Sequence, residues 1–332
     1  MLEENSMYTS NEFRDVEDIC YEEEHVQKVI NSIRSNFDKY FTGYINSHAG
    51  KGVSPESFAE LQKKFRVSID QKKLEKTRAD NYATILREAV IEFEKDREAY
   101  QDILREELLD DYDEDATTFK SKVLKNDCPI IRKTLNSDAE ELKKYKKDFR
   151  LADPDELLNV VTNLCAFSDE YADNYDPETY EEAAKYQDLK LELLDTEDYT
   201  AYGVIGGGIK THILYKAHPG LFPNRSRGAI WALWYLTNKE KFGCKTDSEF
   251  IMIDVKRSFT QQNYFYPYQL FAYYAFEIYK MLRDKALEYG IGIDTAYRYV
   301  AVDSFLNYIA DAHASEIQFF KIKGEDGGYG FA

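Results

Sequence analysis

The chain has 332 residues, of which 43% are hydrophobic and 15% aromatic, and its formal net charge at pH 7 is −18. This length and composition exclude general disorder, allow a substantial core and favour two domains. No apolar stretch approaches the roughly 20 residues of a membrane span, and the first residues lack the basic and then apolar order of a signal peptide. We therefore expect a cytoplasmic protein with no membrane partner.

The cysteines and histidines argue against a zinc enzyme. Cys20, Cys128, Cys165 and Cys244 are far apart and lack the paired close spacing of zinc and redox motifs, so we expect free thiols. The five histidines form no ligand pair at positions i and i+4 together with an acid.

The negative charge is concentrated in the first 200 residues. That part contains 28 Lys and Arg against 48 Asp and Glu, whereas the rest contains 15 against 13. A strongly acidic half repels nucleic acid, while a nearly neutral half can carry a local basic groove.

Residues 1–198 have the pattern of an acidic helical domain. Apolar side chains recur at helical spacing from Val26 to Tyr40 and from Tyr82 to Phe93. The helix through Leu108 is expected to end at the acidic residues 110–115, which favour a solvated loop over a calcium site. Capping residues predict further helix starts at Ser54-Pro55, Asp153-Pro154, Asp176-Pro177, and Ser137 with Glu140.

Residues 199–323 predict a second, smaller domain, because charge thins out there and glycine and aromatic residues become frequent. We expect an α+β domain with few strands, so that the whole chain is predominantly α. Its predicted helices cover residues 209–217, the surroundings of Trp231 and Trp234, residues 268–289, and Asp294 to about Ala312. Its predicted strands cover residues 250–255 and 317–322, and residues 324–332 are expected to form a mobile tail.

Asp254 and Lys256 close the apolar run that predicts the first strand. Side chains alternate faces along a strand, so both project to the same side. That geometry suits a metal ion beside an anionic oxygen, and a salt bridge at the end of the strand is the alternative.

Residues 248–280 resemble the second half of the active-site pattern of PD-(D/E)XK nucleases, in which an acid, any residue and a lysine end a core strand. The resemblance implies that Asp254 binds a divalent metal ion, Mg²⁺, and that Lys256 positions or activates the attacking water. In that family a Gln near a Tyr often follows on the next helix, which implies a catalytic role for Gln269, near Tyr273 or Tyr274.

A glycine-rich turn precedes the helix predicted over residues 209–217. Glycines let backbone N–H groups approach a phosphate, and the start of the helix adds positive potential. We therefore predict phosphate binding by Gly206, Gly207, Gly208 and Lys210, with a plain turn between domains as the alternative.

Arg225 and Arg227 lie where the helix with the tryptophans begins, so their charges oppose its dipole. Two arginines there indicate an anionic partner, which is a phosphate or carboxylate ligand or the acidic half of the chain. The aromatic loop that follows has no helical period, so Tyr264, Tyr266 and Tyr268 are predicted to form a ligand wall or a partner contact.

These patterns lead to two hypotheses. In the first, the C-terminal domain engages nucleic acid or a phosphate ligand, with metal-dependent nuclease activity at Asp254 and Lys256. In the second, the protein is not an enzyme, and its acidic helices bind a basic protein or mimic nucleic acid.

Overall fold

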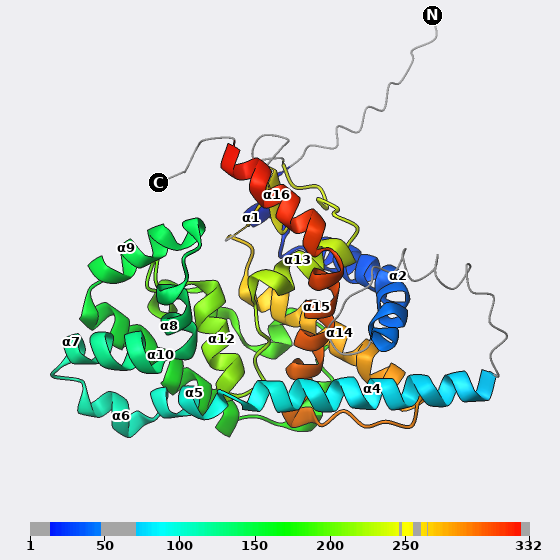
Figure 1. Cartoon of the computed structure of the whole chain (residues 1–332), viewed down its shortest axis with the longest axis horizontal. Helices are drawn as coiled ribbons and strands as arrows, with labels where there is room; N and C mark the ends of the chain where they lie inside the picture. The colour runs from blue at the N-terminus through cyan, green and yellow to red at the C-terminus, as the bar shows by residue number, and fades with distance from the viewer. Residues whose placement is uncertain (1–13, 48–70, 246–247, 255–259, 264, 327–332) are drawn as a thin grey trace, which may run out of the picture.

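The computed structural model describes residues 14–47, 71–245, 248–254, 260–263 and 265–326. Helices dominate these residues (Figure 1), which confirms the predicted predominantly α fold. None of the described helices is long and apolar enough to cross a membrane.

Two groups of elements follow each other along the chain. The α-helices before residue 200 are α1 (Val16–Ile19), α2 (Glu23–Asn46), α4 (Gln71–Glu94), α5 (Arg97–Ile103), α6 (Glu106–Asp111), α7 (Ala116–Thr118), α8 (Pro129–Asn136), α9 (Lys143–Leu151), α10 (Pro154–Asp173) and α11 (Pro177–Glu181). Those after it are α12 (Gly207–Ala217), α13 (Arg227–Leu236), α14 (Tyr268–Glu288), α15 (Arg298–Ala312) and α16 (Ala314–Asp326). A π-helix, η1 (Phe119–Asp127), and the 3-10 turns η2 (Glu140–Leu142), η3 (Tyr186–Leu189), η4 (Glu192–Asp195), η5 (Glu197–Tyr199) and η6 (Thr295–Tyr297) complete the helical elements described.

Two of the predicted helix starts are confirmed. Asp153 and Asp176 each accept a backbone amide hydrogen bond at the start of α10 and α11, and a proline follows each of them. The capping box of Ser137 with Glu140 is wrong, because Ser137 Oγ accepts from the amide of Ala139 and the helical turn begins after that residue. Ser54-Pro55 lies outside the described residues.

The core on the α2 side of the molecule is a bundle of α2, α4, α13, α14 and α15. Phe37 and Tyr44 of α2 pack against Phe305 of α15 with ring centroids 5.3 and 5.4 Å apart, and Phe41 meets Tyr82 of α4 at 5.2 Å. The apolar stripe predicted for α2 is therefore buried against helices from the far end of the chain. The domain boundary near residue 198 stays a prediction.

A second group of helices surrounds α10. This helix contacts α6, α7, η1 and α12, and α8 packs against both η1 and α9. In Figure 1 this group occupies the opposite side of the molecule from α2, and α4 runs along the lower edge from the bundle toward α5.

The strands described form one antiparallel hairpin, β1 (Met252–Asp254) and β2 (Thr260–Gln262). Its register pairs Met252 with Gln262 and Asp254 with Thr260, and β1 lies within the predicted strand 250–255. The last predicted strand, residues 317–322, is wrong because these residues belong to α16. Ile317 is buried and Phe320 stacks on Trp231, so the apolar spacing there is three residues, as in a helix. Residues 324–326 also belong to α16, and the rest of the predicted tail lies outside the described residues.

A buried arginine ties α15 to α11. Arg298 is fully buried, donates to the Gly220 carbonyl at 2.5 Å and forms an ion pair with Glu181. Glu181 also pairs with Arg283, at 2.7 Å, but the Arg283 side chain is 34% exposed. The two arginines share one carboxylate and differ in burial.

We predict that Arg298→Met lowers the free energy of unfolding by about 1–3 kcal/mol, because the buried Gly220 carbonyl loses its hydrogen-bond donor while Glu181 keeps its ion pair with Arg283. The matched variant Arg283→Met is expected to cost only about 0–1 kcal/mol. Urea denaturation of both variants measures the difference, and equal losses would contradict the importance of burial.

Candidate functional site

The predicted catalytic residues are only partly described. Asp254 ends β1, and its side chain, together with Lys256 and Tyr264, lies outside the described residues. Gln269 is buried in the first turn of α14, and its side-chain amide donates to the Tyr21 hydroxyl at 3.5 Å. The nuclease resemblance therefore stays a prediction.

Most residues predicted to bind phosphate lie around Asp195. The carboxylate of Asp195 accepts the amides of Tyr268 and Gln269, at 2.7 and 3.0 Å, at the start of α14. Burial raises the pKa of Asp195, and these amides together with the charges of Arg225 and Lys210 oppose that shift. We call Asp195, Lys210 and Arg225 the Asp195 cluster.

Both cations of the Asp195 cluster are buried and hydrogen-bonded within the protein. Lys210 donates to the Leu194 carbonyl and to Thr200 Oγ1, and burial lowers its pKa to about 8. Arg225 donates to the Asn263 carbonyl at 3.2 Å. The cluster thus joins η4, α12, α14 and the end of the hairpin.

The glycine-rich turn lies against the same cluster. Gly206 caps α12, and Gly207 and Gly208 form its first turn. A Cβ atom on Gly207 would lie 3.2 Å from Nη1 of Arg225, so the guanidinium covers this end of the helix. The other predicted arginine, Arg227, is exposed at the start of α13.

The described rings of the aromatic loop differ in burial. Tyr268 is fully buried and donates to the Pro223 carbonyl at 3.0 Å. Tyr266 is also buried, and its hydroxyl lies 2.7 Å from that of Tyr274 and 3.2 Å from Nε2 of His25. Among the described residues of this loop, Phe265 is the ring that solvent reaches, with 72% of its surface exposed.

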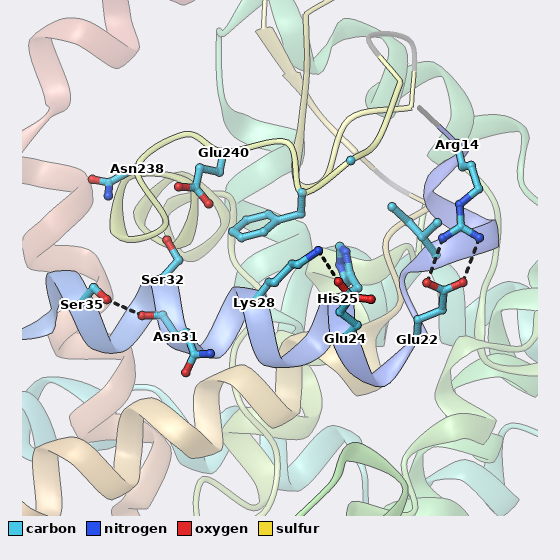
Figure 2. A pocket seen from close by; sticks show the side chains of 13 residues that line it. Arg14, Glu22, Glu24, His25, Lys28, Asn31, Ser32, Ser35, Asn238 and Glu240 are labelled. Carbon is cyan, nitrogen blue, oxygen red and sulfur yellow. Dashed lines mark hydrogen bonds and ion pairs between the residues drawn. The ribbon is translucent and has the colours of Figure 1, made fainter. Parts of the chain in front are cut away.

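An open polar groove of about 800 Å³ lies between α2 and the turn after α13 (Figure 2). Glu24, Lys28, Asn31 and Ser35 follow one another at helical spacing along its α2 wall. Glu24 pairs with Lys28 at 2.7 Å, and Arg14 pairs with Glu22 through two bonds of 2.9 and 2.8 Å. These charges neutralise one another and leave the groove polar.

His25 forms part of the floor of this groove. Its ring lies edge-on to Phe242 and Phe250, and burial lowers its pKa from 6.5 to about 4, with the Phe242 backbone opposing the shift. Through Tyr266 it connects to the aromatic core, so the imidazole is held neutral at neutral pH.

The wall opposite α2 has unusual backbone geometry. Asn238, Lys239, Phe242 and Gly243 all have positive φ angles, between 52° and 84°. A left-handed conformation costs roughly 1–2 kcal/mol for a residue other than glycine, so the surrounding structure must hold this turn. The Gly243 carbonyl accepts the amide of Arg14 at 3.2 Å, which fixes the turn across the end of the groove.

A second groove of about 480 Å³ adjoins the first, and Asn238 lines both. Here the Tyr40 hydroxyl lies 3.1 Å from Nε2 of His313, and the rings of His313 and Tyr235 stack 3.7 Å apart. The two grooves form one polar surface that follows α2.

A local excess of positive charge lies elsewhere, in residues 119–152, which span η1, α8 and α9. This basic segment holds ten Lys and Arg against five Asp and Glu, in a chain whose net charge is −18. The run Lys143-Lys144-Tyr145-Lys146-Lys147 was a visible signal, but a count over 200 residues hides it. The prediction from sequence did not consider this segment as a candidate binding surface.

The cations of α9 are sorted to one side of the helix. Phe149 is buried and Tyr145 partly buried, whereas Lys144, Lys147 and Arg150 are exposed. None of these three side chains makes an ion pair with a residue that the structure describes. We call these three residues the α9 face.

We predict that the stability of the protein falls in acid because His25 must be charged. Between pH 6.5 and about 4 the unfolded chain binds a proton there and the folded protein does not, so unfolding becomes easier as pH falls. From pH 7 to 4.5 the wild type is expected to lose about 2–3 kcal/mol more than His25→Gln, as measured by urea denaturation. Parallel pH curves for the two proteins would contradict a buried neutral imidazole.

No protein-family model, curated protein or solved structure matches this chain. Within the described ranges, no three His, Cys, Asp or Glu side chains gather in a way that could hold a metal ion. Function is therefore inferred from the charges, grooves and exposed rings of the described residues.

Proposed function

We propose that this protein binds nucleic acid through the basic segment, with the α9 face at its centre. The observation that carries the proposal is the α9 face itself, which presents three exposed cations without ion-pair partners among the described residues. Exposed lysines and arginines bind phosphate backbones by releasing condensed counterions. This is the interaction that an exposed basic surface supports best.

The neighbouring elements add charge to the same interface. Lys120 of η1 donates to the carbonyls of Arg150 and Ala152, so η1 contacts the end of α9 directly. Lys122 and Lys125 of η1 are exposed. A π-helix as long as the nine residues of η1 is rare, and π-helical turns occur frequently at functional sites.

The acidic remainder of the chain contributes by repulsion. A net charge of −18 repels phosphate from most of the surface, so an approaching strand is directed to the basic segment. Binding is then expected to be sensitive to salt and largely independent of base sequence.

We predict that Lys144→Glu, Lys147→Glu and Arg150→Glu together weaken nucleic-acid binding about tenfold or more at low salt, because three phosphate contacts are lost. The slope of log K against log salt concentration should also become shallower by about 2–3. Fluorescence anisotropy with labelled 20-nucleotide DNA and RNA, between 25 and 200 mM NaCl, measures both effects.

The matched control is Lys28→Glu, Arg87→Glu and Lys95→Glu, which changes net charge equally at exposed positions on or next to α2 and α4. It should bind nearly as the wild type does. If both triple variants bind equally weakly, binding depends on net charge alone and not on the α9 face. A wild-type protein that binds no oligonucleotide would refute the proposal.

Metal-dependent nuclease activity at the hairpin is a second proposal. It is supported by the contact between Arg225 and the Asn263 carbonyl, which puts a residue predicted to bind phosphate beside the end of β2. Asp254 is the residue assigned to Mg²⁺, and Gln269 lies at the start of the following helix.

We expect Asp254→Ala and Lys256→Ala each to abolish cleavage of labelled DNA or RNA in the presence of Mg²⁺, as followed on denaturing gels. EDTA provides the metal-free control. Substrates that stay intact with wild-type protein in Mg²⁺ and in Mn²⁺ would refute the nuclease and leave the binding proposal untouched.

The competing proposal is a non-enzymatic protein that binds another protein. It is supported by the polar surface along α2, where the side chains of Asn238 and Glu240 form no hydrogen bond or ion pair with a described residue. The four buried free thiols also fit the proposed location in the reducing cytoplasm.

A further inference from the structure

We infer that the nucleic acid bound at the α9 face is single-stranded and that the ring of Tyr202 stacks on one of its bases. The inference rests on the proposed nucleic-acid binding and names its substrate class. Tyr202 is the most exposed large hydrophobic residue among those described, at 73%.

Tyr202 lies at the tip of a tight turn that the core holds in place. The amides of Val204 and Ile205 both donate to the Ala201 carbonyl, at 3.0 and 2.8 Å, and these three residues are buried. Gly203 supplies the positive φ of 81° that the turn needs. The ring is therefore presented to solvent on a rigid support and loses little conformational entropy on binding.

The turn lies against α9. A Cβ atom on Gly203 would fall 2.9 to 3.1 Å from side-chain atoms of Asp148, so the two backbones approach closely there. Lys144 is one helical turn before Asp148, and Leu151, 67% exposed, is about one turn after it on the same side. An exposed aromatic ring and an exposed leucine thus lie beside the cations of the α9 face.

This combination favours a single strand over a duplex. The bases of a duplex stack on one another and offer only their edges in the grooves, so an aromatic ring on a surface turn has no base plane to cover. In a single strand the bases are free to stack on aromatic side chains while cations follow the backbone. The Tyr202 hydroxyl donates a long hydrogen bond, of 3.4 Å, to Glu197 Oε1. This contact leaves the faces of the ring open to solvent.

Tyr202→Ala tests the inference, with Tyr202→Phe as the matched variant that keeps the ring. Anisotropy with labelled oligo(dT) of 20 nucleotides and with a 20-base-pair duplex compares the two substrates for each protein. We expect the wild type to prefer the single strand, Tyr202→Ala to bind it at least about 5-fold more weakly with an unchanged salt slope, and Tyr202→Phe to bind as the wild type does.

The outcomes separate this inference from the proposed function. If neither substrate binds the wild type, nucleic-acid binding itself fails. If both substrates bind equally well, if Tyr202→Ala binds the strand as tightly as the wild type, or if Tyr202→Phe loses as much as Tyr202→Ala, the binding proposal stands and the inference is overturned. Leu193→Ala, at a leucine 51% exposed in η4, controls for loss of exposed apolar surface.

Discussion

The packing of α2 against α13, α14 and α15 is the constraint on which the rest of the structure depends. It brings rings such as Phe37 and Tyr44 from the start of the chain against Phe305 near its end, in the interior of one helical bundle. Once α2 lies there, its polar side forms the wall of both grooves, and α4 extends along the molecule toward the helices around α10. The α9 face belongs to that other group, away from the bundle.

Two sets of cations in this chain differ in burial and in whether described residues compensate their charges. Lys210 and Arg225 are buried, and their hydrogen bonds and Asp195 compensate their charges within the protein. Lys144 and Lys147 are exposed on a helix whose apolar side faces inward. Buried cations that are compensated internally stabilise the fold, whereas exposed cations without such partners are available to a phosphate backbone.

Local features of the fold could be predicted from the sequence because they depend on near neighbours. Helical spacing located α2 and α4, and Asp153 before a proline identified the start of α10. The strand predicted near Ile317 is wrong because a short apolar run fits both the strand period and the helix period. The contact of Phe320 with Trp231 decides for the helix.

The candidate sites could be predicted only in part. The grooves depend on a left-handed turn at residues 238–243 packing against α2, some two hundred residues away, and no local pattern reports such a contact. Tyr266 and Tyr268 were predicted to form a ligand wall or a partner contact, but both rings are buried and their hydroxyls have hydrogen-bond partners in the core. The excess of lysine and arginine in the basic segment can be seen in the sequence, but only when charges are counted over the length of one or two helices.

The central claim is that a single strand binds at the α9 face. Its most direct test is to photocrosslink a strand that carries 4-thiothymidine and to identify the crosslinked peptides by mass spectrometry. Binding at the α9 face predicts crosslinks within residues 119–152 and in the turn of residues 201–205, both lost at high salt. Crosslinks confined to the grooves along α2 or to the hairpin would contradict it.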